Sequence, residues 1–94
     1  MTDKIATMTD HELAEQLFAA VKPDGFGIKG AIAAGEDVAA IIDLVEQAAI
    51  QRIHLRQELV DAVADFADDP ALDSDDTTAI REGLATLRPL ALTA

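Results

Sequence analysis

Cysteine, tryptophan and tyrosine are absent from this chain of 94 residues, and phenylalanine occurs three times. Without cysteine there is no disulfide bond, no thiolate metal site and no cysteine nucleophile, so a reduced, cytoplasmic protein is expected. The amino-terminal sequence has no basic segment followed by an apolar run, so we expect no secretory signal. Apolar runs also stay below the roughly 18 residues that a transmembrane helix requires, which predicts no membrane-spanning segment.

Groups suited to catalysis are also scarce. His11 and His54 are the two histidines, and neither has a companion at metal-ligand spacing. Ser74 is the single serine, and its place before an acidic turn favours a helix N-cap over a nucleophile. The glycine pattern of residues 25–30, GFGIKG, resembles a dinucleotide-binding loop, but a predicted helix stands where that motif needs a strand. We therefore predict a protein that is not an enzyme, with no catalytic residue, cofactor or metal.

Negative charge is the strongest feature that is present. Eighteen acidic and seven basic side chains give a net charge of −11, which predicts no direct binding to nucleic acid or to an anionic membrane. Eight carboxylates follow one another from residue 58 to residue 76 with no cation between them: Glu58, Asp61, Asp65, Asp68, Asp69, Asp73, Asp75 and Asp76. This predicted acidic face has two interpretations, a solvated surface that keeps the protein soluble or a docking surface for a basic protein.

The apolar half of the sequence predicts an all-α fold, because alanine, leucine, isoleucine and valine dominate it and recur at helical spacing. Thr9 and Glu12 have the spacing of a capping box, which predicts a first helix over 10–21. A short helix is expected over 28–34, and a last one from Ser74 to the proline at position 89.

The segment 36–68 contains no glycine or proline and keeps helical apolar spacing throughout. As one helix it would be about 50 Å long, more than a domain of this size can cover. It must therefore bend or break near 51–56, or a second chain must cover its apolar stripe. We favour the second alternative, a bundle of three to four helices that self-associates with Arg52 near the centre of the contact. The expected self-association face comprises Ile41, Ile42, Val45, Ile53, Leu59 and Val60.

These observations predict a single helical domain over residues 1–94 that acts as a non-enzymatic protein-interaction or assembly subunit and forms a homo-oligomer. The alanine-rich composition suits a bacterial or phage structural component. The alternative function is that of an acidic antagonist, which masks a basic, nucleic-acid-binding surface on another protein. Salt separates the two, because charge masking weakens strongly with ionic strength whereas helix packing does not.

Overall fold

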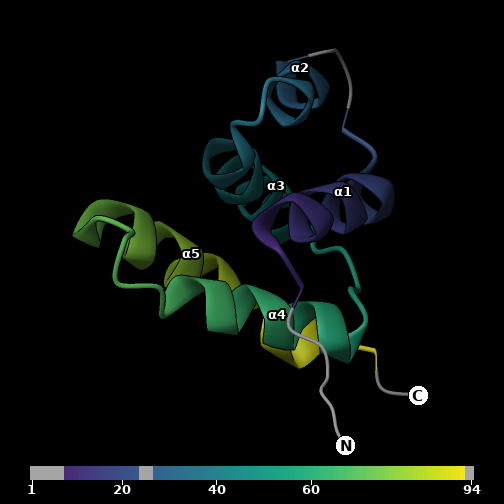
Figure 1. Ribbon diagram of the computed structural model, residues 1–94. Helices are drawn as coiled ribbons and strands as arrows, with labels where there is room; N and C mark the ends of the chain where they lie inside the picture. Colours follow the sequence, from purple (N-terminus) through teal and green to yellow (C-terminus); the bar gives the residue numbers. More distant parts are fainter. Residues whose placement is uncertain (1–7, 24–26, 93–94) are drawn as a thin grey trace, which may run out of the picture.

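The computed structural model describes residues 8–23 and 27–92, and these residues form an all-helical structure (Figure 1). The elements are α1 (Asp10–Val21), α2 (Gly27–Ala33), α3 (Asp37–Gln51), α4 (Gln57–Ala67), α5 (Ser74–Leu87) and a 3₁₀ helix (Arg88–Leu90). The all-α prediction is thus confirmed, but the predicted count of three to four helices is wrong, since the described part contains five α-helices. The predicted turn at 24–26 and the ends of the chain, 1–7 and 93–94, lie outside the described residues.

Helix α1 begins where the capping box predicts. The Thr9 hydroxyl accepts a hydrogen bond from the Glu12 backbone N–H at 3.1 Å, and the Glu12 carboxylate accepts one from the Thr9 N–H at 3.0 Å. These bonds hold the pKa of Glu12 below its ordinary value. The helix ends at Lys22, whose φ of 52° is left-handed, and Pro23 prevents its continuation. The predicted range 10–21 is confirmed.

The predicted long central helix is wrong, because segment 36–68 forms two helices. Arg52 ends α3 in the left-handed region, with a φ of 53°, and its N–H reaches the carbonyls of Ala48 and Ala49. The greatest extent of the molecule is 40 Å, shorter than the roughly 50 Å of an unbroken 33-residue helix. The structure therefore has the break near 51–56, and not the unbroken helix covered by a second chain that the sequence analysis favours.

The carboxyl-terminal segment holds this break in place. The Leu92 N–H donates to the Leu55 carbonyl at 2.8 Å, and the Gln57 N–H donates to the Leu92 carbonyl at 2.7 Å. The ring Nδ1 of His54 also donates to the Leu90 carbonyl, at 3.0 Å. No side chain caps the start of α4, so the Leu92 carbonyl satisfies one of the N–H groups that a helix start leaves free.

The core forms around α3, which packs against α1, α2 and α5, while α4 packs against α5 and α1 (Figure 1). This packing uses much of the predicted self-association face. Four of its residues, Ile41, Val45, Leu59 and Val60, are at most 1% exposed within the chain's own core, and Ile42 and Ile53 are half-buried against that core. The four buried residues are therefore not available to a second chain in this structure, and the long stripe that led to the prediction is absent.

Helix α5 begins one residue from the predicted cap. The Asp73 carboxylate accepts the Asp76 N–H at 3.1 Å, so Asp73 is the N-cap and Ser74 is the first helical residue. Aspartate and serine are nearly equivalent as caps, which is why composition alone did not separate them. The apolar side of the helix is buried, as its spacing predicts.

The left-handed conformation of Arg52 gives a stability prediction. Arg52→Gly should raise the free energy of unfolding by about 0.5–1 kcal/mol, because glycine adopts this conformation without the clash of a Cβ atom. Arg52→Val should lower it, because a β-branched side chain fits this region worst. Urea denaturation measures both, and a valine variant as stable as the glycine variant would contradict the helix break.

Candidate protein-interaction groove

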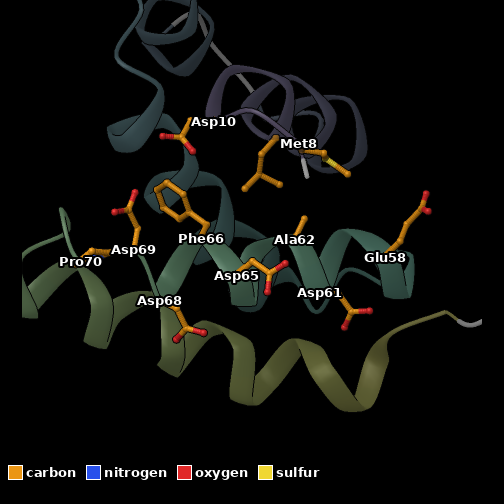
Figure 2. A pocket seen from close by; sticks show the side chains of 11 residues that line it. Met8, Asp10, Glu58, Asp61, Ala62, Asp65, Phe66, Asp68, Asp69 and Pro70 are labelled. Atoms are coloured by element: carbon orange, nitrogen blue, oxygen red, sulfur yellow. The ribbon is translucent and has the colours of Figure 1, made fainter. Parts of the chain in front are cut away.

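A groove of about 470 Å³ lies between the start of α1 and the length of α4 (Figure 2). We call it the acidic groove, and it is lined by Met8, Asp10, Leu13, Glu58, Asp61, Ala62, Asp65, Phe66, Asp68, Asp69 and Pro70. The groove exists because α1 packs against α4 only at part of its surface, leaving the rest of that face of α4 open.

The floor of the acidic groove is apolar. Ala62 projects from α4 toward Met8, which precedes α1, and Phe66 projects on the same side of α4 (Figure 2). Phe66 and Leu13 belong to the buried core, whereas Met8 and Ala62 are half-buried and pack against it. A ligand in the groove would therefore contact apolar side chains that are held rigidly from behind.

Carboxylates surround this floor. Five residues of the predicted acidic face lie here, namely Glu58, Asp61, Asp65, Asp68 and Asp69, and the structure adds a sixth carboxylate, Asp10 of α1. The sequence pattern does not place Asp10 on this face, because nothing local indicates that α1 lies beside α4. The remaining predicted residues Asp73, Asp75 and Asp76 lie outside the groove, at the start of α5.

Cations of the chain neutralise only part of this charge. Glu58 forms an ion pair with Arg56 at 3.0 Å, and Asp68 forms one with Arg81 at 3.1 Å. All four side chains are more than half exposed, so each pair contributes about 0–1 kcal/mol and leaves its carboxylate accessible to water.

The other four carboxylates of the groove form no ion pair within residues 8–23 and 27–92. Asp61 accepts a hydrogen bond from the Gln57 side chain at 2.9 Å, and Asp69 accepts one from the Ala71 N–H at 2.9 Å. The groove therefore keeps most of its negative charge for an incoming ligand.

Local helix stability does not explain the acids at one end of the groove. Asp65 lies in the last turn of α4, and Asp68 and Asp69 follow at its carboxyl end. The helix dipole disfavours an anion there by about 0.3–1 kcal/mol each. The Arg81 ion pair compensates for Asp68 and the hydrogen bond from the Ala71 N–H for Asp69, whereas Asp65 has neither kind of partner in the described structure. A stability cost that is retained at an exposed site favours a role in binding.

A second hollow, of about 650 Å³, lies where α1, α3 and α5 begin. It shares Asp10 with the acidic groove, and its other carboxylates are Glu36, Asp37, Asp43 and Asp76. Asp10, Asp37 and Asp76 lie in the first turns of their helices, where the dipole stabilises anions, so helix stability accounts for most of this charge. Partial desolvation raises the pKa of Asp76, and the neighbouring Asp73 and Asp75 act in the same direction. The acidic groove is therefore the better candidate for a binding site.

The two histidines and the glycine pattern have structural positions. His11 Nδ1 lies 2.9 Å from the Asp37 carboxylate, which joins α1 to α3, and His54 holds the carboxyl-terminal segment. Gly27 and Gly30 lie in α2, while 25 and 26 are outside the described residues. Across the described ranges, no three His, Cys, Asp or Glu side chains converge in a way that could hold a metal ion.

The contact between His11 and Asp37 predicts a pH dependence of stability. The hydrogen bond that the His11 ring donates to the Asp37 carboxylate raises the pKa of His11 above its ordinary value of 6.5, and the charges of Asp37, Glu15 and Glu12 act in the same direction. Because the folded pKa exceeds the unfolded one, the stabilisation is fully present below pH 6.5 and is lost as the pH rises through the folded pKa. The urea concentration at the unfolding midpoint should therefore decrease as the pH is raised from about 6 to about 8.5.

His11→Gln is the control, because it removes the titrating group and leaves every other ionisable group unchanged. The difference in urea midpoint between wild type and this variant should be larger at pH 6 than at pH 8.5. An equal difference at both pH values would show that His11 has the same affinity for a proton in the folded and unfolded states.

Comparisons with protein-family models, curated proteins and solved structures found no match for this chain. In the part of the chain that the structure describes, no helix has both the length and the apolar character needed to cross a membrane. The function must therefore be argued from the chemistry of the acidic groove.

Proposed function

We propose that this protein is a non-enzymatic interaction domain that binds a basic segment of another protein in the acidic groove and thereby covers positive charge on that partner. The observation that supports the proposal is the set of six carboxylates around an apolar floor. Opposite charge accelerates encounter and selects the partner, while apolar contact slows dissociation. This is the acidic-antagonist alternative, with a defined site.

Two other ligand classes suit the groove less well. Five of its six carboxylates are spread along α4 and its carboxyl end, so an extended array of cations fits them better than a single metal ion. Nucleic acid would place phosphates against the carboxylates and be repelled. The self-associating assembly subunit stays a prediction, but its main support, the unbroken central helix, is gone.

A charge-neutralising variant tests the proposal. Asp61→Asn combined with Asp65→Asn removes two charges from the rim, and neither residue forms an ion pair in the described structure that would be broken. With a labelled lysine-rich peptide and fluorescence anisotropy as the measurement, the dissociation constant should rise about 2- to 30-fold, at 0.2–1 kcal/mol for each lost exposed pair.

The matched control is Glu46→Gln combined with Glu82→Gln, which changes the net charge equally at two exposed residues that line neither the acidic groove nor the second hollow. Its effect should stay below about twofold at physiological salt, where charges more than roughly 8 Å apart are screened. If both variants weaken binding equally, the interaction depends on net charge alone and not on the acidic groove. If the wild type does not bind the peptide, the proposal is contradicted.

A further inference from the structure

We infer that the segment bound in the acidic groove is an amphipathic α-helix of about three turns, supplied by a different protein, with a row of Lys or Arg beside an apolar stripe. The inference rests on the proposed function and adds the conformation and pattern of the ligand. Three features of the groove support it: the spacing of its carboxylates, the absence of a strand edge, and the apolar floor.

The carboxylates of α4 follow a helical row. Figure 2 shows them along the helix from Glu58 to Asp69, and Asp61, Asp65 and Asp68 continue the row at intervals of three or four residues. At 1.5 Å per residue, neighbours in this row rise by about 4.5–6 Å, and the four carboxylates from Glu58 to Asp68 span about 15 Å. Cations at positions i, i+3 or i+4, and i+7 of a second helix are separated by the same distances along its axis, so each can lie opposite a carboxylate of α4.

An extended ligand does not keep this register. Side chains on one face of a strand recur about every 6.6–6.8 Å, so four of them span about 20 Å and drift past the carboxylates. The backbone gives a stronger reason. The described residues contain no β-strand that could pair with an extended chain, and the floor of the groove is apolar. Backbone N–H and C=O groups laid on such a floor would lose their water, whereas a helix satisfies them internally.

The floor also fits one face of a helix. Ala62 is small and half-buried, and it lies between Phe66 and Met8, so an aliphatic side chain can approach the α4 backbone closely there. Carboxylates flank this floor, so the ligand needs its apolar residues on one stripe and its cations beside them. If the apolar residues and cations of this ligand exchanged positions, some of its cations would face the apolar floor of the acidic groove.

The ligand is not a second copy of this chain. Within the described residues each helix carries at most one cation, Lys29 in α2, Arg81 in α5 and Arg88 in the 3₁₀ helix, while α1, α3 and α4 carry none. None of these helices can present a row of cations at intervals of three or four residues. Charge complementarity therefore requires a helix from a different protein.

Three synthetic peptides of about 15 residues test the inference on the whole wild-type chain. The first is alanine-based, with lysines at i, i+3 or i+4, and i+7 beside a leucine stripe. The second has the same composition with lysine and leucine positions shuffled, and the third is the first with a central alanine replaced by proline. The first should bind at least about tenfold more tightly than the other two, because they lose the stripe or the helix. Its ¹³Cα shifts should move to helical values on binding.

The outcomes separate the two proposals. If all three peptides bind equally, the ligand need not be helical and this inference fails, while the proposed function stands. If no peptide binds, the proposed function fails with it. The position is tested by amide shifts in the protein, which should change along α4 and at the start of α1. Changes confined to the second hollow, at Asp37, Ile42 and Asp76, would overturn the assignment of the site.

Discussion

Replacing Ile41 with aspartate is expected to unfold the protein, whereas the same change at the adjacent Ile42 should leave it folded. Ile41 is 0% exposed and belongs to α3, the helix at the centre of the core. Its replacement would bury a carboxylate with no partner, which costs several kcal/mol in addition to the lost apolar contacts. Domains of this size have a total stability of about 5–15 kcal/mol, so this cost is comparable to all of it.

Ile42 is the matched control because it is half-buried and lines the open second hollow, where an aspartate side chain can reach water. Its replacement should lower the urea midpoint moderately and leave the helical circular-dichroism spectrum unchanged. Both residues belonged to the predicted self-association face, so the pair also tests that prediction. A folded Ile41→Asp protein would show that the core is misplaced, and an oligomer that Ile42→Asp converts to monomers in sedimentation would establish a self-association contact at the second hollow.

The features that could be predicted from sequence are those that depend on neighbours along the chain. The capping box of Thr9 and Glu12 places a donor and an acceptor three residues apart, so the start of α1 follows from local geometry. Gly35 similarly ends the second helical segment, with a left-handed φ of 81° that glycine adopts without strain. The helical spacing of apolar residues predicts each buried face for the same reason.

The length of segment 36–68 leaves a break near 51–56 as one of two alternatives, but the sequence could not decide for it, because the causes of the break are distant in sequence. No glycine or proline marks it, and Arg52 adopts a left-handed conformation that arginine seldom takes. The Leu92 carbonyl, 35 positions beyond Gln57, supplies the missing cap of α4. Only the folded chain brings the two together, so a local pattern that suited one continuous helix was overridden by tertiary packing.

In the acidic groove, too, one feature depends on neighbours along the chain and another on residues that are distant in sequence. Its row of carboxylates could be found because Glu58, Asp61 and Asp65 share one face of one helix. Its apolar floor could not, because Met8 lies more than fifty positions from Ala62 in the sequence and nothing local brings them together. A sequence of this kind therefore predicts the charge of a surface more readily than its shape.

The contact between α3 and α5 leads to a second prediction of a large effect on stability. It depends on a glycine of α5, which has no side chain at the point where the two helices meet. Gly83 is buried, and a Cβ atom added there would lie 2.7 Å from the Val45 Cγ1 atom. Gly83→Ala should therefore destabilise the protein by up to about 2 kcal/mol, because overpacking costs about 1–3 kcal/mol and the higher helix propensity of alanine returns about 1. Gly30→Ala in α2 is the control, since a Cβ atom there meets nothing within 4 Å, and it should stabilise by about 0.5–1 kcal/mol.

A double-mutant cycle decides whether Val45 causes this cost. Val45 is 1% exposed, and Val45→Ala alone should destabilise by about 1.5–2 kcal/mol through the loss of two buried methyl groups. It also removes the atom that a Cβ at position 83 would meet, so the alanine at 83 then fills part of the space left behind. The double variant should be more stable than the sum of the two single effects by about 1 kcal/mol or more, measured by urea denaturation. Strict additivity would mean that the two positions do not touch, and the packing of α5 on α3 would have to differ from the one described.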